Sequence, residues 1–186
     1  MPPNFWEEQT VDHLKQFVIP FKGLSVGNHS FEFQIDDKFF DAIEYSELHK
    51  GNVGLKLEML KEERMLIFDF NFAGTVEVIC DRCLDPFDFP IKGHERLLVK
   101  FGEGWEEETD EIIVIPEGEY QFDLSPYIYE YINLLLPMQR IHPDNENGES
   151  TCNPEMLEML GNIQEIKEDH DPRWDVLLKL KNEDKN

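Results

Sequence analysis

The chain has 186 residues, of which 40 are acidic and 17 basic, and its formal net charge at pH 7 is −23. This charge disfavours a direct grip on a nucleic-acid backbone, which needs Lys and Arg, and it disfavours anionic membrane surfaces. It favours a cationic protein partner, or it confers only solubility. The length suits one domain with an extended tail, and 40% hydrophobic residues, including 14 Phe, are enough to fill a core.

Three kinds of sequence signal bear on the compartment. Residues 1–15 show no basic region followed by an apolar run, so no secretory signal is expected. No apolar stretch approaches the length of a membrane span. Three cysteines are too few and odd in number for a disulfide framework. We therefore expect a cytoplasmic protein that does not enter a membrane.

The first two thirds of the chain predict a succession of β-strands. Phe31, Phe33 and Ile35 alternate with polar residues, which is the period of a half-buried strand. A charged turn at residues 61–64 separates two alternating segments and indicates a hairpin. Strands are expected at residues 14–21, 29–35, 53–60, 65–72, 75–79, 87–91, 94–101 and 112–115, and a short helical turn at 36–43. This pattern predicts an antiparallel sheet or a partial β-barrel.

A long amphipathic helix is expected after the strands. Ser125 followed by Pro126 is typical of a helix cap with proline in the first turn. Pro137 then ends the run. The apolar residues that fall on one face at helical spacing are Leu124, Tyr127, Ile128, Tyr131 and Leu135.

The C-terminal quarter reads as a polar loop and a helical tail. Residues 143–153 are polar, whereas residues 154–167 place apolar side chains at helical spacing, and Asp171-Pro172 begins a final short helix. The expected organisation is one α+β domain over residues 1–142, followed by the loop and tail over residues 143–186. The fold class is α+β.

Cys80 and Cys83 are the sharpest local feature. A redox pair of the thioredoxin type needs its first cysteine at a helix N-terminus, whereas Cys80 ends a predicted strand and Pro86 follows closely. A hairpin turn is the usual setting of a zinc knuckle, and zinc needs two further ligands, for which His142 and Cys152 are the candidates. Four protein ligands would make the zinc structural. Inert thiols and redox chemistry stay open as alternatives, because the second pair is widely spaced.

The remaining motifs do not indicate an enzyme. There is no phosphate-binding glycine-rich loop and no serine in a nucleophile elbow. His94-Glu95 begins like a zinc-protease motif, but no histidine follows at the required position.

Arg173 and Trp174 are candidates for partner binding. They stand in a tail helix with a bulky aromatic face and basic residues, on an otherwise acidic chain. A docking element is one interpretation, and a tryptophan that packs on the core is the other.

Two pieces of sequence resemble signatures of one family. Residues 80–87, Cys-Asp-Arg-Cys-Leu-Asp-Pro-Phe, look like the Cys-x-Arg-Cys-Leu-x-Pro-Phe signature of the YceD family, the large ribosomal RNA subunit accumulation proteins. Asp123-Leu, followed by the expected helix and residues 134–137, is similar to its Asp-Leu…Leu-x-Leu-Pro segment. In many members a second cysteine cluster follows this segment; here only His142 and Cys152 stand there.

A third piece lies near the end of the chain. Asp171-Pro-Arg-Trp174, with Leu177 and Leu180, resembles the Asp-Pro-Arg…Leu-x-x-Leu ending of the family. The three pieces agree in order and spacing over residues 75–181. The resemblance implies a small non-enzymatic cytoplasmic protein needed for accumulation of large-subunit ribosomal RNA.

The net negative charge of the chain limits the class of partner that we expect. Because the chain is so acidic, contact with RNA is expected only indirectly or within a complex. The expected partner is a basic ribosomal protein or assembly factor; an unrelated basic protein, held by a zinc-stabilised adaptor, is the alternative. The residues expected to hold the partner by charge are Glu103, Glu106, Glu107, Glu108, Asp110 and Glu111.

Overall fold

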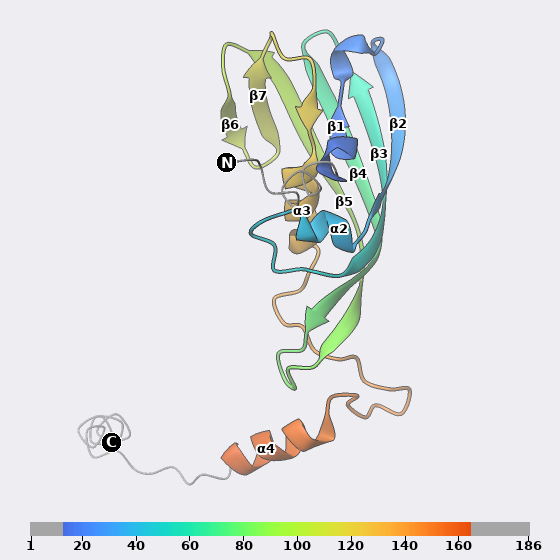
Figure 1. Cartoon of the computed structure of the whole chain (residues 1–186), viewed down its shortest axis with the longest axis vertical. Coiled ribbons are helices and arrows are strands. Elements are labelled where there is room, and N and C mark those ends of the chain that lie inside the picture. Colours follow the sequence, from blue (N-terminus) through green and yellow to red (C-terminus); the bar gives the residue numbers. More distant parts are fainter. Residues whose placement is uncertain (1–12, 165–186) are drawn as a thin grey trace, which may run out of the picture. The chain divides into compact units, whose positions relative to one another are not determined.

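The computed structural model describes residues 13–164, which fall into two compact parts, 13–142 and 143–164 (Figure 1). The first part contains eight strands, the helices α2 and α3, and two 3₁₀ turns at Lys15–Phe17 and Phe21–Gly23; His13 and Leu14 are also helical. Its elements are β1 (Val18–Ile19), β2 (Gly27–Ile35), α2 (Asp37–Asp41), β3 (Gly51–Lys61), β4 (Met65–Ile79), β5 (Pro86–Gly102), β6 (Glu106–Thr109), β7 (Ile112–Pro116), β8 (Phe122–Asp123) and α3 (Ser125–Leu134).

Six strands form one open sheet in the order β2-β3-β4-β5-β7-β6. Neighbouring strands are antiparallel except β5 and β7, which are parallel, so the expectation of an antiparallel sheet or partial barrel is wrong at this pair. The reason is the path of the chain: β6 lies at the edge of the sheet, and β7 turns back antiparallel to it and fills the place between β6 and β5. β7 therefore runs in the same direction as β5. A separate two-stranded sheet pairs β1 with β8.

The two longest strands each join segments that the sequence pattern separates. The ladder of β4 and β5 runs without a break from Met65↔Lys100 to Ile79↔Pro86. The expected strands at 65–72 and 75–79 are therefore one strand, and so are those at 87–91 and 94–101. The expected strand at 14–21 is instead two 3₁₀ turns around the two residues of β1, because Pro20 has no N–H to donate to a ladder.

One face of the sheet holds the core, and α3 packs on it (Figure 1). The even-numbered residues of β4 from Leu66 to Val78 point inward, and all except Gly74 are buried, while the odd-numbered residues face outward. The ring of Tyr131 on α3 meets Phe70 edge to face, with ring centroids 5.1 Å apart. Each such buried side chain contributes roughly 1.5–3 kcal/mol relative to exposure, so this face dominates the stability of the part.

The helix α3 is shorter than expected. It has ten residues and begins at Ser125 with Leu124 as its N-cap, so the expected long amphipathic helix capped by Ser125 is wrong. Asp123 takes the capping role, since its Oδ1 accepts a hydrogen bond of 2.9 Å from the Ser125 amide. Pro137 disfavours helical geometry in the residue before it, which ends the helix early.

The second part contains α4 (Pro154–Gln164). Its start follows from local chemistry: Pro154 suits the first turn, and the side-chain Oδ1 of Asn153 accepts a 3.0 Å hydrogen bond from the Glu155 amide. The expected helix after Asp171 lies outside the described residues, and the division into two domains stays a prediction. No helix within residues 13–164 is long and apolar enough to cross a membrane.

Candidate metal centre

The turn between β4 and β5 carries the Cys80-x-x-Cys83 pair. Its backbone closes tightly: the Cys80 amide donates to the Asp85 carbonyl at 3.0 Å, and the Leu84 amide donates to the Cys80 carbonyl at 2.9 Å. Leu84 has a φ of 63°, a left-handed conformation that is uncommon outside glycine. Non-glycine residues with this backbone conformation are often found at functional sites, where the surrounding structure holds them in place.

Backbone amides of the turn donate hydrogen bonds to the sulfur of Cys80. The Arg82 amide donates to Cys80 Sγ at 3.4 Å, and the sulfurs of Cys80 and Cys83 are buried, with 0% and 1% of each residue exposed. Burial raises the pKa of the Cys80 thiol, but hydrogen bonds from the amides of Cys83, Arg82 and His142 and from the His142 ring outweigh it. The net effect lowers this pKa from 9.0 to about 6, so the turn favours the thiolate, the form that binds metals.

His142 reaches this turn from the segment that follows α3. Its Nδ1 lies 3.4 Å from Cys83 Sγ, and its ring stacks on Phe87 with centroids 4.5 Å apart. Two hydrogen bonds between Asp81 and Arg140 hold the segment there: the Asp81 amide donates to the Arg140 carbonyl at 2.7 Å, and the Arg140 amide donates to Asp81 Oδ2 at 2.6 Å. The histidine is therefore positioned by contacts on both of its sides.

Cys152 completes the cluster. Sγ of Cys80, Cys83 and Cys152 and a ring nitrogen of His142 all lie within 4.8 Å of one another. In a tetrahedral site with Zn–S near 2.3 Å and Zn–N near 2.0 Å, ligand atoms stand about 3.3–3.8 Å apart. The donor set and its spacing suit a structural zinc ion.

The cluster discriminates among the three interpretations of the cysteines. The three cysteines, all within the described residues, form no disulfide, and Cys80 follows a strand and not a helix N-terminus. Four protein ligands fill a tetrahedral site, which leaves no open coordination position for a substrate. The geometry thus fits a closed structural site better than redox chemistry.

The acidic residues expected to hold a partner are on or beside β6, and all are exposed. The segment at residues 103–111 is partly a strand, because Glu106–Thr109 pairs with β7. Glu108 forms an ion pair with Lys100 at 2.6 Å, which neutralises part of the charge. A role of these residues in binding stays a prediction, and Arg173 and Trp174 lie outside the described residues.

Sequence reasoning missed the residues that position the ligands. Asp81 and Phe87 stand within the family-like stretch at 80–87, and Arg140 precedes His142 by two residues. Only their nearness to the ligands in sequence hinted at a role. Pairing across 59 residues, as between Asp81 and Arg140, is a property of the fold.

Comparison with known proteins places the chain in a family. A search of the curated proteins and a search of the solved structures each found no match. The family model described as "Large ribosomal RNA subunit accumulation protein YceD" matches residues 68–181, more than half of the chain. This span contains the whole cysteine turn, His142 and Cys152. The chain therefore belongs to the YceD family.

Proposed function

We propose that this chain is a non-enzymatic cytoplasmic factor that supports accumulation of large-subunit ribosomal RNA by binding a basic ribosomal protein or assembly factor. The family match over residues 68–181 carries the proposal, because the family is named for this role. The net charge of −23 supports the choice of a basic protein over RNA as the direct ligand. RNA then belongs to the larger complex, in which the partner supplies the positive charge.

The strand β6 is the proposed electrostatic contact. Its Glu106, Glu107 and Glu108 are all exposed, and Glu103, Asp110 and Glu111 flank it. Carboxylates gathered at one sheet edge raise the local concentration of a cationic partner and accelerate its association. Such contacts weaken with salt, since exposed charges are screened beyond about 8 Å at physiological ionic strength.

The metal centre has a structural role in this proposal. A zinc ion held by Cys80, Cys83, His142 and Cys152 would fix the β4–β5 turn and the segment after α3 without taking part in chemistry. A closed set of four protein ligands supports the non-enzymatic part of the proposal, because it leaves no coordination position for a substrate. A variant that does not bind zinc is then expected to bind the partner more weakly only to the extent that its folded structure is lost.

Capture from native lysate at low and at high salt tests the proposal. The tagged chain is expected to enrich basic ribosomal proteins or assembly factors at 0.1 M salt and to lose them at about 0.5 M salt. Ribonuclease treatment is expected to leave the direct partner bound. Enrichment of an unrelated basic protein would favour the adaptor interpretation, and capture that ribonuclease abolishes would contradict a protein ligand.

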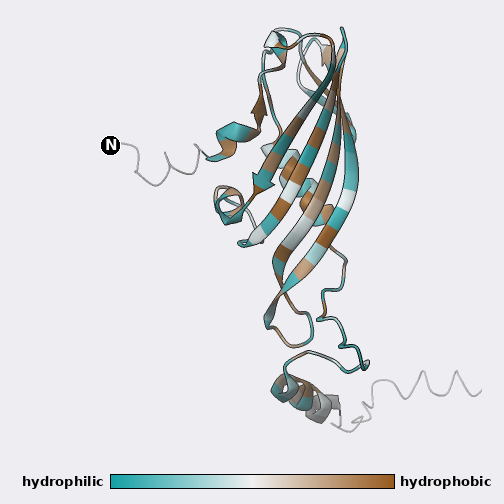
Figure 2. Cartoon of the chain, turned by 90° about the vertical axis from the view of Figure 1, so that its right-hand side faces the viewer, coloured by the Kyte–Doolittle hydropathy of each residue, from teal (hydrophilic) through white to brown (hydrophobic). Residues whose placement is uncertain are grey.

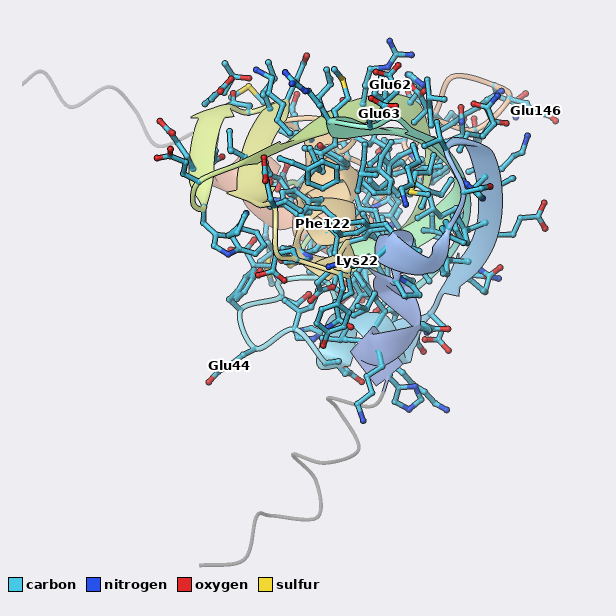
Figure 3. The ribbon with its side chains drawn as sticks, turned by 90° about the horizontal axis from the view of Figure 1, so that it is seen from above. Lys22, Glu44, Glu62, Glu63, Phe122 and Glu146 are labelled. Carbon is cyan, nitrogen blue, oxygen red and sulfur yellow. The ribbon has the colours of Figure 1, made fainter. Side chains whose placement is uncertain are left out.

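A matched pair of variants locates the contact. Replacing Glu106, Glu107 and Glu108 with glutamine removes three negative charges, and the control removes three others by Glu44→Gln, Glu62→Gln and Glu63→Gln. All three control side chains are exposed, and Glu44 projects clear of the ribbon in Figure 3. The β6 variant is expected to bind the partner at least about tenfold more weakly than the control. Equal losses would mean that only total charge matters.

A further inference from the structure

The two edges of the six-stranded sheet are unlike (Figure 1). β6 has four residues, a register shift between Glu107 and Thr109, and three glutamates, the features that protect an edge from pairing with another chain. β2 has nine residues in unbroken register with β3, no proline, and Glu32 as its only carboxylate. Within residues 13–164, no strand pairs with its outer side, so its outward N–H and C=O groups are available for hydrogen bonding.

The core is incomplete beside this edge. Phe31 and Phe33 point to the core face of β2 but are only half-buried, whereas their partners on β3, Leu57 and Leu55, are 0% and 1% exposed. The two rings lie parallel with centroids 6.3 Å apart and form a shelf, and Phe33 also contacts Phe17. Side chains of one more strand would cover this shelf, because alternate residues of a strand project to the same face.

We propose that the outer edge of β2 receives an extended, basic segment of the partner protein as an additional strand of the sheet. This inference rests on the proposed function for the charge of the partner. Main-chain hydrogen bonds along the nine residues of β2 supply affinity, and alternate apolar side chains of the segment cover Phe31 and Phe33. The residues between them are Lys or Arg, which lie on the outer face beside Glu32.

Charge decides between this occupant and a second copy of the chain. A β2–β2 pair would bring together two molecules that each carry a net charge of −23, which repel one another at low salt. A cationic segment is attracted by the same charge. Figure 2 shows the side of the sheet on which β2 lies, where polar and apolar residues alternate along the strands. An added strand with the same alternation would place its apolar side chains on the core face and its polar ones on the outer face.

A synthetic peptide tests the edge directly on the full zinc-loaded chain. The probe has nine residues of alternating Lys and Val with blocked ends. The control is the same peptide with an N-methyl group on every backbone amide, which removes the N–H donors from both edges of the strand. Hydrogen exchange followed by mass spectrometry at low salt is expected to show slower exchange in residues 27–35 and no change in residues 106–109. The methylated peptide is expected to bind at least about tenfold more weakly.

Three results of the peptide assay would overturn the inference. They are protection at β6 in place of β2, equal binding by the methylated peptide, and protection of β2 without peptide in a concentration-dependent dimer. A charge pair adds a second readout: Glu32→Lys is expected to weaken binding of the peptide about tenfold, whereas Glu44→Lys, at an exposed glutamate outside both β2 and β6, leaves it within twofold. If Glu44→Lys weakens binding of the peptide as much as Glu32→Lys, the attraction is general and the edge is not the site.

This failure is distinguishable from failure of the proposed function. Lysate capture by the unaltered chain reports whether a basic ribosomal protein binds at all, whereas the peptide assay reports where an extended cation binds. Capture of such a protein with no protection of residues 27–35 would remove the β2 inference and leave the proposed function in place. Protection of β2 by the peptide without any capture from lysate would remove the proposed partner alone.

Discussion

Asp81 and Arg140 hold one another through two reciprocal hydrogen bonds, although 59 residues separate them. Each main-chain N–H is satisfied, one by the opposite carbonyl and the other by the Asp81 carboxylate. Asp81 stands between the two cysteines of the turn, and Arg140 lies two residues before His142. The pair therefore fixes the histidine ligand to the cysteine turn and acts outside the ligand shell, where positioning residues commonly tune metal affinity.

Removing the Asp81 carboxylate is expected to weaken zinc binding. Asp81→Ala leaves the Arg140 amide without its acceptor, so His142 is held less firmly and affinity falls about 10-fold to 100-fold. Asp81→Asn keeps an acceptor oxygen and is expected to stay within about threefold of the unaltered chain. Competition with a chromophoric chelator measures both. Asp88→Ala, an exposed change on β5, is the control; equal losses in all three variants would contradict the positioning role.

Each of the four cluster residues is expected to be a zinc ligand. Cys152→Ser and His142→Ala remove one donor each from a closed tetrahedral set, so zinc affinity is expected to fall by more than about 100-fold, beyond the effect of a positioning residue. Native mass spectrometry should show one zinc per unaltered chain and little in these variants. His49→Ala, at an exposed histidine, is the control. Full zinc occupancy in Cys152→Ser would exclude Cys152 from the site.

Removing the metal is expected to destabilise the cysteine turn more than the rest of the sheet. Zinc binds the folded arrangement and stabilises it by mass action, about 4 kcal/mol when its free concentration is 1,000 times Kd. Excess chelator should therefore lower Tm and speed hydrogen exchange in residues 80–87 and 138–142. The double variant Cys80→Ser, Cys83→Ser is the control and should not respond. An unchanged Tm for the unaltered chain with chelator would contradict a structural metal.

The local parts of this fold were predictable from the sequence, and the distant pairings were not. Alternation of apolar residues identified β2, β3 and β4 because a strand with one buried face has a period of two. The parallel pairing of β5 with β7 left no such trace, since β6 and β7 are connected like an ordinary hairpin. The four residues of the candidate zinc cluster were predicted from their chemistry alone, with inert thiols and redox chemistry left open as alternatives. The Asp81–Arg140 pair was not, because it depends on where the chain returns after α3.

Two glycines of the sheet distinguish a steric effect on the free energy of unfolding from an effect of backbone freedom. Gly93 on β5 lies under the side chain of Leu135, which would collide with an added Cβ, whereas a Cβ at Gly54 would meet only the Ala73 carbonyl oxygen at an ordinary 3.5 Å. Gly93→Ala is therefore expected to lower the free energy of unfolding by about 1 kcal/mol, the low end of overpacking, because the half-buried Leu135 side chain can shift. Gly54→Ala removes unfolded-state freedom without a collision and is expected to be neutral or slightly stabilising.

Leu135 identifies the cause of the Gly93→Ala loss. Leu135→Ala removes the colliding atoms, so Gly93→Ala is expected to lower the free energy of unfolding less in that background. The loss in the double variant should be smaller than the sum of the two single losses by roughly 0.5 kcal/mol or more, the coupling that residues in contact show. Urea unfolding of the four chains, each with zinc bound, measures this coupling. Strictly additive losses would mean that Gly93 is required for its backbone and not for the room it leaves to α3.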